Sequence, residues 1–148
     1  MRLLKILMIA TIGTVMVSAG LPEGDPKSEN GIEFFDGTWD EALALSEKEG
    51  KPIFLDAYAS WCGPCKVLKA RVFTESSVGE YYNANFINVK RDMERGEGKQ
   101  LARKYRVTAY PSLFFIASDG SVVKKAVGYH DPEKLINLGK SALAVDGI

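Results

Sequence analysis

The chain has 148 residues, of which 46% are hydrophobic and 26% are charged, the composition of one ordinary globular domain. Lysine plus arginine and aspartate plus glutamate both number 19, so the formal charge is zero, and neither nucleic acid nor an anionic membrane surface is favoured as a partner. His130 is the only histidine, which excludes any mechanism that needs two.

The first residues carry the pattern of an export signal. Arg2 and Lys5 give a positively charged start, an apolar run follows from residue 6 to 17, and Val17-Ser18-Ala19 is a small-residue cleavage pattern. The apolar run is shorter than the ~20 residues that a membrane-spanning helix needs. We therefore predict a signal peptide at residues 1–19 and a periplasmic or otherwise exported protein. An uncleaved membrane anchor is the alternative.

After the signal, a flexible lead-in at residues 20–30, rich in proline, glycine and charge, precedes one domain at residues 31–148. Periodicity and capping residues locate its elements. The predicted strands are 32–35, 52–59, 86–90, 112–116 and 122–127. The predicted helices are 38–49, opened by the capping box Thr38–Glu41 and stopped by Gly50; a helix from Cys62; a short helix after a capping box at 77–80; 96–105; and 131–144, opened by Asp131-Pro132.

This order predicts an α/β fold. The first half favours parallel strands joined by crossover helices, while Ser118-Asp119-Gly120 predicts a hairpin turn that makes the last two strands antiparallel. A central mixed β-sheet with helices on both faces fits the length. In the helix from Cys62, the apolar residues should face the core and the basic ones solvent. These are Val67, Leu68 and Val72, and Lys66, Lys69 and Arg71.

The only two cysteines lie in Trp61-Cys62-Gly63-Pro64-Cys65-Lys66. A structural zinc site usually takes four cysteine or histidine ligands, and this chain has three such residues; a copper(I) site remains an alternative. A static disulfide would close too small a loop to stabilise the fold much. In an exported protein, a couple that cycles between dithiol and disulfide explains the pair best.

A position at the start of a helix gives the pair its chemistry. Unpaired N–H groups and the helix dipole would stabilise a thiolate at Cys62, the form that attacks disulfides. Cys65, expected to lie deeper, can then attack the mixed disulfide at Cys62 and release the substrate. Pro64 is tolerated in the first turn, where its missing N–H would be unpaired anyway. Trp61 is either an apolar docking surface or a packing residue.

The sequence W-C-G-P-C-K, preceded by Asp56-Ala57-Tyr58-Ala59, resembles the active-site strand and helix of the thioredoxin family. The likeness covers most of residues 34–143. Gly50-Lys51-Pro52 and Val72-Phe73 look most like the C-terminal domain of the disulfide reductase DsbD and other exported thioredoxin-like proteins. The resemblance implies a thioredoxin-like fold and a thiol–disulfide oxidoreductase.

The resemblance also implies roles for single residues. Asp56 matches a buried carboxylate, whose pKa burial would raise so that it takes the proton from Cys65; a partly solvated carboxylate at a strand edge is the alternative. Pro111 matches a cis-proline, whose loop lies against the cysteines and leaves backbone groups free for an extended substrate. The expected substrate surface consists of Trp61, Gly63, Pro64, Tyr110 and Pro111.

Two positions depart from the family pattern. A lysine that often pairs with the buried aspartate is replaced by Asn88 in our alignment, with Lys90 two residues on. Tyr110 is bulkier than the residue usual before the cis-proline. Because both positions border the reactive groups, we expect the tuning of Asp56, the redox potential and the choice of substrate to differ.

Gly63-Pro64 resembles the reducing members of the family, so we favour a reductase of protein disulfides. A disulfide oxidase or isomerase on the same fold and a copper-binding module are the alternatives. No flavin or nicotinamide motif is visible in the sequence, so no cofactor is expected. Electrons would come from another thiol protein, such as a membrane-embedded reductase, to a monomer that acts on protein disulfides.

Overall fold

A computed structural model describes residues 31–145; the predicted signal peptide and lead-in, at residues 1–30, lie outside the described residues. The helices are α1 (Trp39–Glu49), α2 (Gly63–Val67), α3 (Ser76–Asn85), α4 (Gly98–Lys104) and α5 (Pro132–Leu143), and a π-helical turn, η1 (Leu68–Val72), continues α2. The strands are β1 (Ile53–Tyr58), β2 (Ile87–Asp92), β3 (Ser112–Ile116) and β4 (Val122–Val127).

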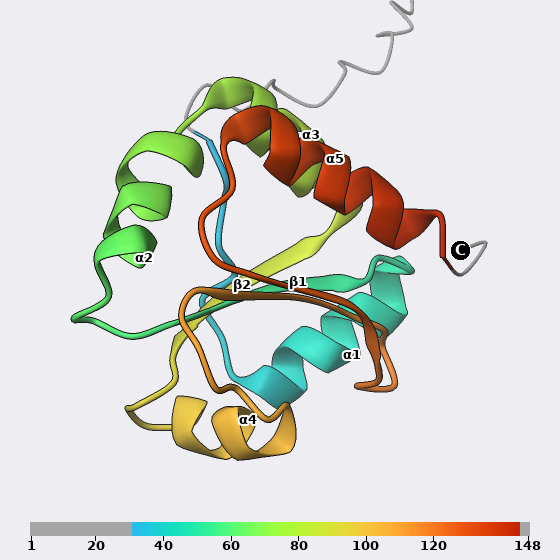
Figure 1. Ribbon diagram of the computed structural model, residues 1–148. Coiled ribbons are helices and arrows are strands. Elements are labelled where there is room, and N and C mark those ends of the chain that lie inside the picture. The colour runs from blue at the N-terminus through green and yellow to red at the C-terminus, as the bar shows by residue number, and fades with distance from the viewer. Residues whose placement is uncertain (1–30, 146–148) are drawn as a thin grey trace, which may run out of the picture.

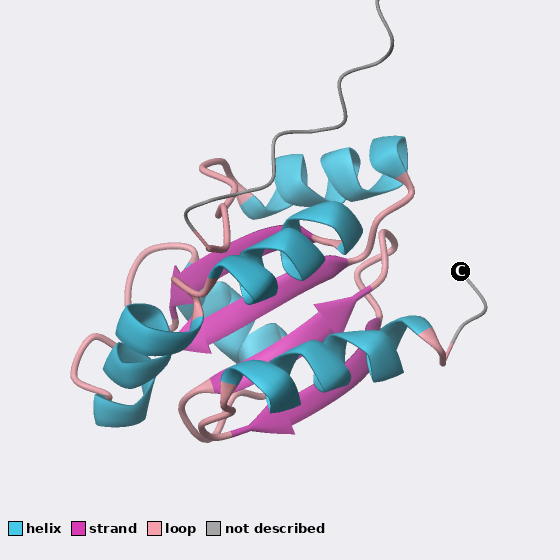
Figure 2. Cartoon of the chain, turned by 90° about the horizontal axis from the view of Figure 1, so that it is seen from above, coloured by secondary structure: helices cyan, strands magenta, loops and turns pink. Residues whose placement is uncertain are grey.

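The strands form one mixed sheet in the order β2-β1-β3-β4 (Figure 2). β1 and β2 are parallel, whereas β1 with β3 and β3 with β4 are antiparallel. This confirms the predicted α/β class and the hairpin at the end of the sheet. In Figure 1, α1 and α4 cover one face of the sheet, and α3 and α5 cover the other.

The alternation of side chains along β1 divides the apolar core into two. Phe54 packs with residues of η1, α3 and α5, whereas Leu55 packs with residues of α1 and α4. Successive side chains of a strand point to opposite faces. Asp56 therefore lies on the same face as Phe54, which is the face that η1 covers.

Two predicted helices have the caps that their sequences indicate. The Thr38 hydroxyl accepts from the Glu41 N–H at 3.2 Å, and the Glu41 carboxylate accepts from the Thr38 N–H at 2.8 Å. Gly50 ends α1 with a φ of 65°, a left-handed conformation that favours glycine. At α5, the Asp131 carboxylate accepts from the Lys134 N–H at 2.8 Å, so the predicted cap before Pro132 is also confirmed.

Two predicted helix starts were wrong. Instead of opening with a capping box at 77–80, α3 begins at Ser76 without a side-chain cap, because the Gly79 N–H already donates to the Glu75 carbonyl at 2.9 Å and closes the first turn. The helix predicted from residue 96 begins at Gly98 instead. Gly96 has a φ of 49°, which a right-handed helix does not accommodate.

The strand predicted at 32–35 is absent from the described part of the chain. This segment runs beside β2, and the Phe35 N–H donates to the Asn88 carbonyl of that strand at 2.8 Å. The Glu33 N–H donates to the Asn83 side chain at 2.9 Å instead of to a strand. Side-chain bonds therefore replace the backbone ladder that apolar residues alone suggested.

One face assignment was also wrong. Leu68 and Val72 are fully buried, as predicted, but Val67 is 40% exposed. Leu68 and Val72 are four residues apart and lie on one side of a helix, whereas Val67 is rotated by about 100° from Leu68. The helix therefore buries a narrower stripe than the run of apolar residues suggested.

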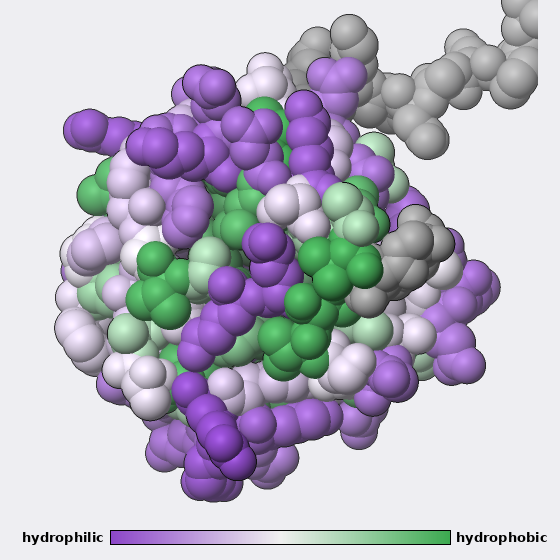
Figure 3. Space-filling model, turned by 45° about the vertical axis from the view of Figure 1, so that its right-hand side comes forward, coloured by the Kyte–Doolittle hydropathy of each residue, from purple (hydrophilic) through white to green (hydrophobic). Residues whose placement is uncertain are grey.

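The helices of the described region fall short of the length and apolarity that a membrane-spanning helix needs. Within residues 31–145, no helix is both long enough and apolar enough to cross a bilayer. On the face shown in Figure 3, hydrophobic residues gather in several groups with hydrophilic residues between them.

Candidate active site

The two cysteines lie where β1 gives way to α2, and they form a disulfide with their Cα atoms 5.3 Å apart. Cys62 is the N-cap of α2, and its sulfur accepts from the Cys65 N–H at 3.2 Å. Pro64 stands in the first turn, where no helical donor is lost. The predicted position of Cys62 at a helix start is confirmed.

The depths of the cysteines differ from the prediction. Cys62 is 3% exposed and Cys65 is 6% exposed, so both are buried to a similar degree and the predicted difference in depth is not seen. The cysteines and Ala59 form a small apolar cluster, and Tyr58 and Tyr110 pack against it. The large Tyr110 side chain is therefore in contact with the cluster that contains both cysteines.

Trp61 projects from the surface beside the pair and is 65% exposed. Its ring contacts that of Tyr110 edge-on, with centroids 5.8 Å apart, and its indole N–H donates to the Glu94 carboxylate at 3.0 Å. Trp61 therefore packs on a neighbouring ring without being buried, and its role as a docking surface stays a prediction. Its indole ring is held open to solvent next to Cys62.

Pro111 follows a cis peptide bond with Tyr110, as the resemblance implied. The Pro111 carbonyl accepts from the Gly128 N–H at 2.9 Å. One backbone carbonyl of the loop is therefore bonded within the fold, while the expectation that the loop leaves backbone groups free for a substrate stays a prediction. Gly63, before Pro64, has open space around its α-carbon, so a polypeptide can approach the chain closely there.

Asp56 is a buried carboxylic acid, 5% exposed, and its Oδ1 atom has no hydrogen-bond partner among the described residues. Burial raises its pKa to about 7, and the positive charge of Lys90 opposes that rise. The alternative of a partly solvated carboxylate was therefore wrong. Its protonation changes near neutral pH, as a group that exchanges protons with a thiol requires.

The charge that accompanies Asp56 comes from Lys90. In the parallel register of β1 and β2, Asp56 is paired with Lys90, whereas Asn88 is paired with Phe54. The Asn88 amide donates to the Asn83 side chain at 3.1 Å, away from Asp56. The alignment that placed Asn88 in the role of the lysine was therefore wrong about the geometry, since a lysine does face the aspartate.

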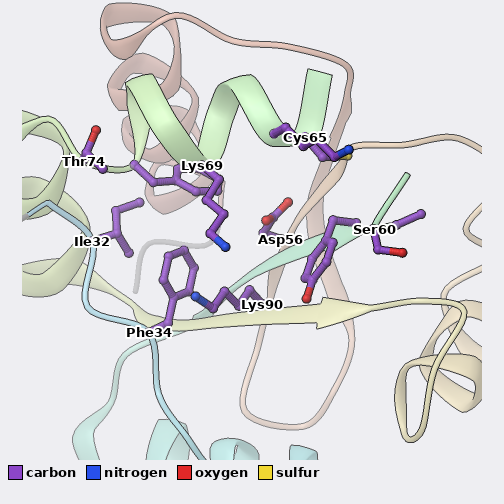
Figure 4. Close-up of a pocket in the computed structure, with 12 residues that line it drawn as sticks. Ile32, Phe34, Asp56, Ser60, Cys65, Lys69, Thr74 and Lys90 are labelled. Atoms are coloured by element: carbon purple, nitrogen blue, oxygen red, sulfur yellow. The ribbon is translucent and has the colours of Figure 1, made fainter. Parts of the chain in front are cut away.

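A cavity of about 470 Å³ joins these groups behind the disulfide. Asp56 and Cys65 line it together with lysines from the neighbouring elements (Figure 4). Sequence reasoning placed Lys66 and Lys69 on a solvated surface; they are exposed, and they also line this cavity. Helix periodicity does not reveal such a space, because it depends on how β2 and the segment before α1 pack against η1.

Metal-binding geometry is not found near the pair. Within residues 31–145, no group of at least three histidine, cysteine, aspartate or glutamate side chains is placed to hold a metal ion. His130 lies in the β4–α5 connection, where its Nδ1 atom is 3.0 Å from the Gly128 carbonyl oxygen. The groups that the fold gathers at Cys62 and Cys65 are a carboxyl group, lysines and aromatic rings.

A model of the thioredoxin-like domain matches residues 39–143. Thioredoxin H9 of Arabidopsis thaliana is 31% identical over 120 residues, which are 75% of this chain and 81% of that protein. The chain belongs to the thioredoxin-like family of thiol–disulfide oxidoreductases, with Cys62 and Cys65 as its close cysteine pair.

The chain is also similar to two bacterial proteins with solved structures. A protein from Bacteroides thetaiotaomicron assigned as a disulphide isomerase has a solution structure with a TM-score of 0.68 and 45% identity, covering 80% of this chain and 97% of that one. The oxidised C-terminal domain of Neisseria meningitidis DsbD has a TM-score of 0.60 and 27% identity, covering 74% and 99%. Against full-length DsbD of that species, 30% identity extends over 77% of this chain but 20% of the relative.

Proposed function

We propose that this protein is an exported reductase of protein disulfides that works through the Cys62–Cys65 pair. The observation that carries the proposal is the position of Cys62 at the N-cap of α2, with its sulfur accepting the Cys65 N–H. In the reduced protein, this donor and the helix dipole favour the thiolate form of Cys62. Cys62 is therefore assigned as the nucleophile.

The reaction transfers two electrons to the substrate. The Cys62 thiolate attacks one sulfur of the substrate disulfide, which forms a mixed disulfide and releases the other sulfur as a thiolate. The Cys65 thiolate then attacks the Cys62 sulfur, so that the Cys62–Cys65 disulfide forms and the second substrate sulfur leaves. The substrate is reduced to a dithiol, and this protein is oxidised to the disulfide that the structure contains.

Asp56 is assigned as the group that takes the proton from the Cys65 thiol before the second attack. Asp56 and Cys65 line the same cavity, and a pKa of about 7 allows the carboxyl group to accept and return a proton near neutral pH. Water in the cavity can carry the proton between the two groups.

The substrate polypeptide is assigned to the surface around Cys62. Trp61 supplies an exposed ring, Gly63 allows close backbone approach, and Pro64 fixes the first turn. Tyr110 and Pro111 form the other side of this docking surface, where Tyr110 packs against the cysteine cluster. Because Tyr110 packs against the cysteine cluster, we expect it to move when a substrate disulfide reaches the Cys62 sulfur.

The direction of electron flow is proposed as reducing. Gly63-Pro64 resembles the reducing members of the family, and similarity to the DsbD C-terminal domain supports the same direction. A disulfide isomerase is the second candidate, favoured by the 45% identity to the Bacteroides thetaiotaomicron protein. An isomerase uses the same first attack but lets the substrate itself resolve the mixed disulfide.

Export and partners follow from the N-terminal sequence and from the chemistry. Arg2, Lys5 and the apolar run to Val17 support export, and sequencing of the exported protein would then begin at Gly20. The oxidised pair must be reduced again by a thiol protein, such as a membrane-embedded reductase. We propose a monomer, because one chain supplies every group that the reaction uses.

The test combines a measurement of the reduction potential with two activity assays. The reduction potential is measured against glutathione, and the purified protein is assayed both for reduction of insulin disulfides and for refolding of scrambled ribonuclease. A reductase gives a potential well below that of the glutathione couple and insulin reduction that Cys62→Ser abolishes. Efficient refolding by Cys65→Ser with little insulin reduction would establish an isomerase, and tight copper(I) binding without either activity would contradict both.

A further inference from the structure

The cavity behind the disulfide has an apolar wall that the proposed redox chemistry does not use. Ile32 and Phe34 come from the segment before α1, and Phe73 follows η1. Phe34 and Phe73 meet edge-on with ring centroids 5.5 Å apart. The volume of the cavity is about 470 Å³, within the range of roughly 300–1,000 Å³ that small-molecule sites occupy.

Three lysines from three elements converge on this wall. Lys66 belongs to α2, Lys69 to η1 and Lys90 to β2. The Lys69 side chain points into the cavity in Figure 4, and the Lys90 ammonium is 4.8 Å from the centroid of the Phe34 ring. No ion pair within residues 31–145 involves any of these lysines.

The floor of the cavity carries a polar group without a partner. The Asp56 carboxyl group is buried and faces the cavity between the Lys69 side chain and Cys65 (Figure 4). Its Oδ1 atom accepts no hydrogen bond from any described residue. A buried polar atom in this position usually has a water or ligand partner, so the cavity combines a polar floor, a cationic rim and an aromatic wall.

We propose that this cavity binds a small organic anion, in which a carboxylate contacts the lysines and an aromatic or branched apolar body packs on Phe34 and Phe73. Three positive charges face one buried acid, so the site has a net positive charge that an anion offsets. An apolar group that packs on the aromatic wall is removed from water, which favours its binding over that of water in the same space. The proposal does not depend on the direction of the redox reaction.

The test uses 4-phenylbutyrate as the probe and 4-phenylbutan-1-ol as its uncharged match, each titrated into the oxidised protein. Calorimetry gives the affinities, and amide NMR shifts give the location. A probe of this size should bind with a Kd of about 1 mM or tighter. We expect the alcohol to bind about tenfold more weakly, and the shifts to centre on residues 32–34, 58–60 and 65–74 and on Lys90.

Matched lysine variants identify the charges that hold the probe. Lys69→Gln and Lys90→Gln should each weaken phenylbutyrate binding about threefold or more without changing the affinity for the alcohol. Lys99→Gln, at an exposed lysine of α4 outside the cavity, should leave both affinities unchanged. Circular dichroism checks that each variant is folded.

Three results would overturn the proposal. They are no saturable binding of phenylbutyrate, equal affinities for the acid and the alcohol, and a loss of affinity in Lys99→Gln as large as in the cavity variants. None of these results bears on insulin reduction or on the reduction potential. The two proposals can therefore fail separately.

Discussion

Asp56 is a buried acid within β1, and burial is the largest cause of its raised pKa. The folded chain holds its proton up to a pKa of about 7, whereas the ordinary value is 3.8. Between these two values the folded state binds more protons than the unfolded state. The free energy of unfolding therefore falls as the pH rises through this window.

Asp56→Asn should remove this pH dependence. The variant and the wild type should be similarly stable near pH 4, and at pH 8 the variant should be more stable by on the order of 2–4 kcal/mol. Urea unfolding of the oxidised proteins at both pH values measures the difference. Asp36→Asn, at an exposed aspartate, is the control; an advantage of Asp56→Asn that is the same at both pH values would contradict this account.

Lys90 acts on Asp56 through its charge. Lys90 lowers the pKa of Asp56 against the larger effect of burial, so Lys90→Gln should raise that pKa further. The pH at which the Cys65 thiol begins to displace substrate from Cys62 should then shift upward, as single-turnover reduction of a chromogenic disulfide would show. An unchanged profile, or the same shift in Lys99→Gln, would show that the charge of Lys90 does not reach Asp56.

At the scale of elements, Glu97 joins three parts of the fold. Its carboxylate accepts from the Trp39 N–H at the start of α1 at 2.8 Å and from the Arg91 side chain of β2 at 3.0 Å. Arg91 also donates to the Gly37 carbonyl. Since Glu97 directly precedes α4, this group fixes α4 and α1 to the same edge of the sheet.

Glu97→Ala should lower the free energy of unfolding by about 1.5–3 kcal/mol, because it leaves charged and backbone donors without their acceptor. Glu49→Ala is the matched case. This variant removes an ion pair between Glu49 and Lys51, whose charged atoms are 3.6 Å apart and whose side chains are both more than a third exposed. The loss in the free energy of unfolding should be less than about 1 kcal/mol. Equal losses in the two variants would contradict the linking role of Glu97.

Local sequence was informative wherever a short-range contact determines the element. The capping box at Thr38, the left-handed Gly50 and the cap at Asp131 follow from residues three or four apart. The segment at 32–35 could not be assigned in this way, since its bonds go to Asn83 and Asn88, about 50 residues later. Those partners are known only once β2 and α3 are in place.

At the scale of the whole molecule, the reactive pair was predictable but its surroundings were not. Two cysteines with a glycine and a proline between them favour a redox-active pair on local sequence alone. The charge beside Asp56 depends on the β1–β2 register. The packing around the cysteines includes Tyr110, which is 48 residues from Cys62 in the sequence. The cavity likewise requires four separate elements to meet.

The thiolate at Cys62 is the central claim, and alkylation of the reduced protein tests it most directly. Iodoacetamide is added at pH 7, and the labelled peptides are separated by mass over time. The account predicts that Cys62 is labelled at least about tenfold faster than an unstructured cysteine peptide, while Cys65 is labelled more slowly than Cys62. Labelling of Cys62 no faster than the peptide, in protein that remains folded, would contradict the account.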